Sequence, residues 1–228
     1  MKNIALPFPY TLAYQANNVI KIRSNTMNKK TKQELDVIRS TITGTLVSNG
    51  ETYFTLKHDV LQELETIANK FYTHAPQCIF LITDGGCTNN GKENATGTWS
   101  AMLIRTTQNE ESTPRIICKL YSGTVENPTN NRAELTAIHE GTCKLNKRVH
   151  KLIIVSDSKY ATDALSGKTK IKKNGPLINS TKRTLASKAE LIMFERVKGH
   201  DGHPLNELVD ALASNQLSIA DFGIKGGE

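Results

Sequence analysis

The sequence has few cysteines and no long apolar run, and each lack narrows the class of protein. No stretch approaches the roughly 18 apolar residues that a membrane-spanning helix needs, so we expect no membrane partner. The four cysteines, Cys78, Cys87, Cys118 and Cys143, show neither a C-x-x-C pair nor the spacing of a zinc site. A disulfide framework is therefore not expected. The sequence favours a reduced intracellular compartment, most simply the cytoplasm.

Acidic residues are missing from the first 33 residues, whereas the chain as a whole is mixed in charge, with a net charge of +7. This segment has no sustained hydrophobic period, which predicts a mobile basic tail. Disorder, a basic arm that holds nucleic acid, and a presequence for a mitochondrion or plastid all stay open, although a single Arg argues against the presequence. The basic residues of the segment are Lys2, Lys21, Arg23, Lys29, Lys30 and Lys32.

Residues 34–75 predict a small β-hairpin followed by a helix. Strand-like runs at 42–47 and 52–56 flank Ser48-Asn49-Gly50, and an Asn-Gly pair is a strong hairpin signal. Because an amphipathic helix must bury one face, we expect this unit to pack on the following domain or on a protein partner. The apolar residues at helical spacing, before the stop at Pro76, are Val60, Leu61, Leu64, Ile67, Ala68 and Phe71.

Residues 76–222 predict a single α/β domain, and residues 223–228 form a short tail. The first three strands suggest an antiparallel meander, and later strands alternate with helices. The order βββαβααβα predicts a five-stranded mixed sheet flanked by helices. The expected strands are 79–82, 99–104, 116–121, 152–155 and 191–197, and the expected helices begin near 131 and 205 or span 158–166 and 176–187.

Four acidic residues stand where carboxylates can meet. Asp84 and Asp157 each end a short apolar strand, the place where open α/β sheets bind ligands. Glu134 is expected in the first turn of a helix, and Asp210 lies within the last helix, where Asp is mildly disfavoured. Each acid alone has a structural explanation, as a turn residue or as a partner of the helix dipole.

Together these acids indicate a metal site. Four carboxylates at one rim would repel one another unless cations neutralised them. Oxygen ligands with room for water suit Mg²⁺ or Mn²⁺ rather than zinc. Two such ions about 4 Å apart can activate a water and stabilise the leaving oxygen of a phosphodiester.

The segments around the acids resemble the signature blocks of ribonuclease H type 1, in the family's order and over roughly residues 78–215. The helix-start block and the Gly-His loop block match closely, and the first block has Gly86 where many members have Ser. Any one block is a weak motif, whereas four in register are strong evidence. The blocks are TDGGC at 83–87, TNNRAEL at 129–135, SDSKY at 156–160, and KGHDGHPLNE at 198–207 followed by Asp210.

The resemblance implies a ribonuclease H-like fold and endonucleolytic hydrolysis of the RNA strand of an RNA–DNA hybrid, leaving 5′-phosphate and 3′-hydroxyl ends. It implies that Asp84, Glu134, Asp157 and Asp210 ligate two Mg²⁺ ions, with Mn²⁺ as the substitute. His200 resembles the family histidine that assists proton transfer and product release, a role that suits a near-neutral pKa.

The resemblance also implies contacts with the hybrid. Cys87, Asn90, Asn130 and Asn131 match positions at the minor groove, and Thr129 matches a residue that binds a DNA-strand phosphate. For the two neighbouring asparagines, a helix N-cap is the structural alternative.

The family's Trp-containing basic helix, the handle, is replaced here by a short lysine-rich segment at 167–175 without an aromatic residue. Lysines attract phosphates without regard to sequence, and salt screens this attraction. We therefore expect weaker hybrid binding than in relatives with a handle. The lysines concerned are Lys168, Lys170, Lys172 and Lys173.

Three alternatives to an independent enzyme remain open from the residues. One is a catalytically silent hybrid-binding or scaffold subunit with the same fold. Another is the ribonuclease H part of a reverse transcriptase, with residues 1–75 as the end of a connecting domain. The third is a related nuclease such as an integrase or resolvase, which the helix-start and Gly-His blocks argue against.

Overall fold

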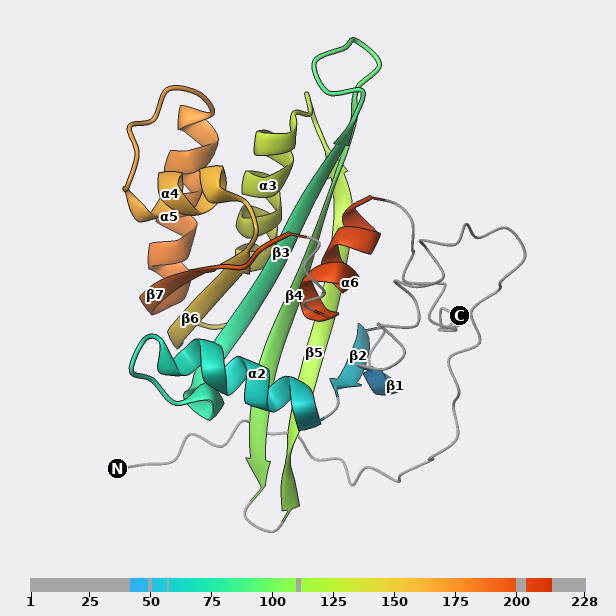
Figure 1. The fold of residues 1–228 in the computed structure, drawn as a ribbon, viewed down its shortest axis with the longest axis vertical. Coiled ribbons are helices and arrows are strands. Elements are labelled where there is room, and N and C mark those ends of the chain that lie inside the picture. The colour runs from blue at the N-terminus through green and yellow to red at the C-terminus, as the bar shows by residue number, and fades with distance from the viewer. Residues whose placement is uncertain (1–41, 49–50, 57, 110–111, 200–203, 215–228) are drawn as a thin grey trace, which may run out of the picture.

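The computed structural model describes residues 42–48, 51–56, 58–109, 112–199 and 204–214 (Figure 1). The predicted basic tail at 1–33 and the end at 223–228 lie outside these ranges. Within them, no helix combines the length and the apolar character that crossing a membrane requires. The described residues form one mixed sheet with helices on both faces.

The centre of the sheet is the predicted five-stranded unit. Strands β3, β4 and β5 form an antiparallel meander, and β6 and β7 follow in parallel beside β3. The strand order is β1-β2-β5-β4-β3-β6-β7, which confirms the predicted ribonuclease H-like topology. The strands are β1 Ile42–Ser48, β2 Glu51–Leu56, β3 Cys78–Thr88, β4 Thr96–Asn109, β5 Ser112–Val125, β6 Val149–Ser156 and β7 Ala189–Arg196.

The predicted hairpin, β1 and β2, joins this sheet and extends it to seven strands. Strand β2 pairs antiparallel with β5, with Tyr53 opposite Lys119 and Thr55 opposite Ile117. This pairing uses backbone groups at the edge of the sheet, so the pattern of side chains does not predict it. The hairpin and the central sheet therefore form one continuous ladder.

Among the described residues, five helices and one short 3-10 helix cover the two faces of the sheet. Helices α3, α4 and α5 lie on one face, and α2 and α6 lie on the other (Figure 1). All the predicted helices are present, although α2 ends before the predicted Phe71 and Pro76 belongs to the separate 3-10 helix. The helices are α2 His58–Asn69, η1 Ala75–Gln77, α3 Asn130–Cys143, α4 Lys159–Ser166, α5 Gly175–Lys188 and α6 Pro204–Ala213.

Alternation along β3 divides the interior into two cores. Phe80 and Ile82 face the side of α2 and α6, whereas Leu81 faces the side of α3. Each of these three side chains is fully buried. Since successive residues of a strand point to opposite faces, Asp84 continues the row of Phe80 and Ile82.

Helix α2 shares the first core. Its Leu64, Ile67 and Ala68 are buried in the same cluster as Leu208 and Val209 of α6. The helix thus buries its apolar face on the sheet that follows it in the chain.

Candidate active site

Asp84 lies on β3 directly opposite Ser100 of β4. It is a buried acid, with 7% of its surface exposed. The strand does not stop at Asp84, as the apolar pattern predicted, but runs on to Thr88. Residues 84–88 are not apolar, and they stay in the sheet because they pair with residues 96–100 of β4.

Glu134 lies in the second turn of α3. The helix begins at Asn130, and Thr129 is its N-cap, with a side-chain oxygen that accepts from the Arg132 N–H at 3.2 Å. The expectation of a first-turn position was therefore wrong. Since the helix dipole acts mainly on the first turn, it gives a weaker structural reason for an acid here.

Gly85 allows α3 to reach the strand. A Cβ at Gly85 would lie closer than 3.0 Å to backbone atoms of Ala133 and Glu134. Any other residue would push the helix away from β3 and move Glu134 with it. The Gly85 N–H also donates to both Asp84 and Glu134, which lowers their pKa values in part.

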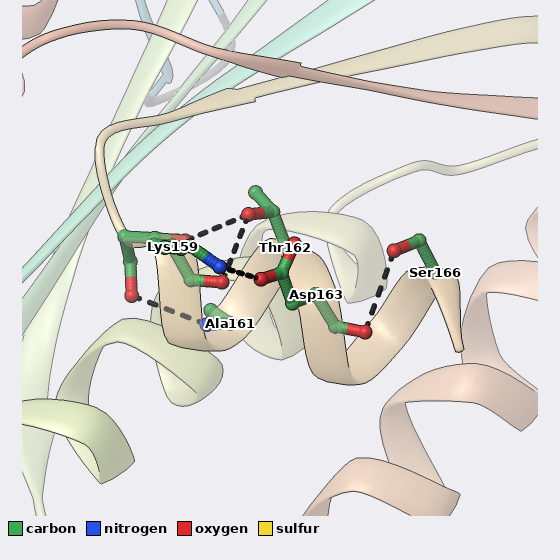
Figure 2. A network of polar contacts seen from close by, with 6 residues as sticks. Lys159, Ala161, Thr162, Asp163 and Ser166 are labelled. Carbon is green, nitrogen blue, oxygen red and sulfur yellow. Dashed lines mark hydrogen bonds and ion pairs between the residues drawn. The ribbon is translucent and has the colours of Figure 1, made fainter. Parts of the chain in front are cut away.

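Asp157 occupies the tight turn between β6 and α4. The Ser156 hydroxyl accepts from the Ser158 N–H at 3.1 Å, and the Ser158 hydroxyl caps α4 by accepting from the Ala161 N–H at 3.2 Å. Figure 2 shows this helix start, where Lys159 pairs with Asp163 one turn further on. Two serines thus fix the backbone on both sides of Asp157.

Gly199 lies against the same acid. A Cβ at Gly199 would lie closer than 3.0 Å to Oδ2 of Asp157. A side chain at this position would therefore require the Asp157 carboxylate to move, a consequence that the motif alone does not reveal. His200, the next residue, lies outside the described residues, as do residues 201–203.

The structure brings the predicted carboxylates together. Single oxygen atoms of Asp84, Glu134 and Asp157 lie within 4.8 Å of one another. Asp210 on α6 is outside this group of three, yet its charge acts on both Asp84 and Glu134. Acids from strand β3, from the turn after β6 and from two helices therefore converge.

The electrostatics of the cluster favour a bound cation. Burial, followed by the charges of Asp210 and Asp157, raises the pKa of Asp84 to about 7. Burial and the neighbouring acids raise the pKa of Glu134 well above its ordinary value. Oε2 of Glu134 is buried and has no hydrogen-bond partner. A divalent cation would supply that missing partner and relieve the repulsion, so these residues fit a metal.

The residues predicted to contact the minor groove lie at the C-terminal end of β3 and at the start of α3. Cys87 is half-buried near the end of β3, and Asn90 is exposed in the turn that follows. Asn130 and Asn131 are exposed in the first turn of α3. The helix cap belongs to Thr129, so the N-cap explanation of the two asparagines was wrong.

The lysine-rich segment between α4 and α5 contains no helix within residues 167–174, all of which are described. Its four lysines are exposed. The Tyr160 hydroxyl donates to the Lys173 carbonyl at 3.0 Å and accepts from the Asn174 side chain at 3.2 Å. One tyrosine of α4 therefore anchors the end of the loop.

Comparison with known proteins shows which family the chain resembles. The chain is 32% identical over 151 residues to a protein named ribonuclease H from Caldicellulosiruptor saccharolyticus, and the match covers 61% of this chain and 95% of that relative. It is 35% identical over 153 residues to a ribonuclease H from Caldanaerobacter subterraneus subsp. tengcongensis, covering 62% and 92%.

A solved structure is similar in fold. It is that of LC9-RNase H1, described as a type 1 RNase H with the type 2 active-site motif, with a TM-score of 0.50 at 21% identity over 61% of this chain and 71% of that one. The family model for RNase H matches residues 76–218. The chain therefore belongs to the ribonuclease H family.

Proposed function

We propose that this chain is a type 1 ribonuclease H that hydrolyses the RNA strand of RNA–DNA hybrids endonucleolytically, leaving 5′-phosphate and 3′-hydroxyl ends. The observation that carries the proposal is the convergence of Asp84, Glu134 and Asp157, with Asp210 beside them, in a chain of this family. Neither a hybrid-binding scaffold nor a structural domain needs buried acids that raise one another's pKa values.

The proposed cofactor is a pair of Mg²⁺ ions, with Mn²⁺ as the substitute. Asp84, Glu134, Asp157 and Asp210 would hold them. When bound, such ions would make a bound water easier to deprotonate and would stabilise the charge on the leaving oxygen. The chain's own part is to hold four carboxylates in fixed positions against their mutual repulsion.

His200 is proposed to take or give a proton near the departing phosphate. It follows Gly199, which lies against Asp157, so the chain enters the segment of His200 at the carboxylate cluster. A side chain whose ordinary pKa is near neutral can act in either direction at physiological pH.

Recognition of the hybrid is proposed to use two surfaces. On the first, Cys87, Asn90, Asn130 and Asn131 would contact the minor groove, where amide groups can both donate to and accept from a 2′-hydroxyl. Thr129, beside them, would bind a DNA phosphate. The second surface consists of Lys168, Lys170, Lys172 and Lys173, which attract phosphates further along the duplex.

The proposed organisation keeps residues 76–222 as the catalytic domain, 34–75 as its extension, 1–33 as a basic tail and 223–228 as a short end. The extension is also the proposed place for a protein partner. We propose an intracellular enzyme that acts in the cytoplasm. A fusion of residues 1–33 to a fluorescent protein would test the mitochondrial or plastid alternative.

The decisive experiment compares a labelled RNA–DNA hybrid with matched RNA duplex, DNA duplex and single strands. Each substrate is incubated with Mg²⁺, with Mn²⁺ and with EDTA, and Asp84→Asn serves as the control for a contaminating nuclease. We expect metal-dependent cutting of the hybrid's RNA strand alone, lost in the variant. Binding of the hybrid without cutting under either metal would instead support a silent subunit, and cutting of plain DNA duplex would support an integrase-like or resolvase-like nuclease.

A further inference from the structure

Helix α6 carries Asp210, and two hydroxyl groups of β4 reach its backbone. The Ser100 hydroxyl donates to the Val209 carbonyl, and the Thr98 hydroxyl donates to the Ala213 carbonyl. Val209 directly precedes Asp210, and Ala213 is the last residue of the helix. The two bonds therefore hold the helix on either side of Asp210 in the chain.

The same two residues are the sheet neighbours of the first block of the motif. Ser100 lies opposite Asp84, and Thr98 lies opposite Gly86, in the antiparallel pairing of β3 with β4. Directly opposite residues of an antiparallel pair point to the same face. The Ser100 hydroxyl thus stands beside the Asp84 carboxylate, on the face that α6 covers.

Gly86 makes room for this arrangement. A Cβ at Gly86 would lie 3.0 Å from the Ala213 carbonyl oxygen and 3.6 Å from the Thr98 hydroxyl. The first is tighter than an ordinary van der Waals contact. The glycine at this position therefore lets the end of α6 lie beside Thr98.

Packing alone does not fix the position of Asp210. Leu208 and Val209 are buried against the sheet, but apolar contact is non-directional and holds a helix less firmly against sliding or rotation. When ionised, Asp210 and the other acids of the cluster repel one another, which disfavours this position of α6. Two directed bonds to the helix backbone oppose both movements.

We propose that Ser100 and Thr98 are positioning residues of the metal site, which hold α6 so that Asp210 faces Asp84 and Glu134. The proposal rests on the proposed function, since it assigns these hydroxyls to the site that binds the metal. Both residues act through the backbone of the helix rather than on the substrate or a metal.

The test uses the full chain and four variants at three positions on one face of one strand. Ser100→Ala and Thr98→Val each remove a hydroxyl that reaches α6. Thr96→Val is the matched control, because the Thr96 hydroxyl bonds the Thr88 hydroxyl across the same two strands. Thr98→Ser is the conservative variant, which keeps the hydroxyl.

Two readouts separate positioning from folding. Mn²⁺ binding is measured by calorimetry without substrate, and kcat and KM are measured on the hybrid. Changes to residues that orient metal ligands typically lower metal affinity or activity by about 10–100-fold. We expect Ser100→Ala and Thr98→Val to weaken Mn²⁺ binding and lower kcat by about tenfold each, at the lower end of that range, with KM for the hybrid unchanged. Thr98→Ser and Thr96→Val should behave as the wild type.

Several outcomes would overturn the proposal. Wild-type Mn²⁺ affinity in both hydroxyl-deleted variants would show that α6 needs no hydroxyl, while cleavage by the wild type would leave the proposed function intact. Equal losses in Thr96→Val would point to a general weakening of the strand pair. If Ser100→Ala unfolds, the Mn²⁺ affinity and kcat of Thr98→Val decide between the outcomes, because Thr98 is partly exposed. A wild type that neither binds Mn²⁺ nor cuts the hybrid would overturn both proposals.

Discussion

The carboxyl group of Asp84 binds its proton more tightly in the folded protein than in the unfolded chain. Its pKa rises from 3.8 to about 7 because of burial and the charges of Asp210 and Asp157. Between these two values the folded state holds more protons than the unfolded state. The metal-free protein should therefore be most stable below about pH 4 with respect to this group and lose that stability as the pH rises through about 7.

Replacing Asp84 tests whether this group makes the metal-free protein less stable as the pH rises. We expect Asp84→Asn to be more stable than the wild type at pH 8 in EDTA, by on the order of 2–4 kcal/mol, with the difference vanishing near pH 4. Urea unfolding at pH 4, 6 and 8 measures it. Mg²⁺ in place of EDTA should stabilise the wild type at pH 8 and leave the variant unchanged. Parallel pH curves for the two proteins would contradict the raised pKa.

A second prediction at the scale of one residue concerns Gly199 and the affinity of the site for metal. Its missing side chain leaves space for Asp157, so Gly199→Ala should displace that carboxylate and lower metal affinity by roughly 10–100-fold. Gly175→Ala is the control, because its Cβ would meet its nearest atom at an ordinary 3.7 Å. Calorimetric titration with Mn²⁺ measures the metal affinity of both variants. Equal Mn²⁺ affinities in Gly199→Ala and Gly175→Ala would exclude the steric role of Gly199.

At the scale of elements, the loop between α4 and α5 presents four exposed lysines and contains no helix within residues 167–174. Changing all four of its lysines to Gln should weaken hybrid binding and reduce the salt slope of affinity by about 1 for each phosphate that the loop no longer binds. The value of kcat at saturating substrate should not change. Tyr160→Phe keeps every charge but frees the loop end from Lys173, so we expect a smaller loss of affinity and an unchanged salt slope. A quadruple variant with the wild-type salt slope would exclude this loop from the interface.

Helix α2 belongs to the same element scale, because it fills a face that α6 also covers. Leu64 is fully buried there, and Leu64→Ala should destabilise the protein by about 2–5 kcal/mol. Gln62→Ala, on the exposed side of the helix, is the control. Since the core is shared, calorimetry should show a single shifted transition for residues 42–214. Two separate transitions would mean that the extension folds by itself.

For the whole molecule, the sequence predicted the identity of the strands and helices better than their ends. The apolar runs mark where side chains enter the two cores, and those runs lie inside β3, β4 and β5. The strand ends consist of polar residues and glycines, such as Gly86 and Thr88, which remain in the ladder through backbone pairing. The docking of β2 on β5 was not predicted for the same reason, because the pairing of a sheet edge leaves no side-chain period.

The site follows a similar division. The motifs predicted which acids meet, because four blocks in one order resemble a single family and mark the positions of its acids. They did not reveal how the acids are held, since that depends on distances between elements. Gly85 against α3, Gly199 against Asp157, and Ser100 beneath α6 are each ordinary residues in the sequence. Their roles appear only when strands and helices lie beside one another.

The sheet face under α6 has a consequence for the order in which a growing chain acquires activity. A ribosome makes Asp84 on β3 and Asp157 in the turn after β6 before it makes the helix that carries Asp210, which is the last described element. Until α6 emerges, three carboxylates stand without the fourth, and the apolar row of Phe80 and Ile82 is only partly covered. Cutting should therefore begin only after α6 has left the ribosome and packed on the sheet.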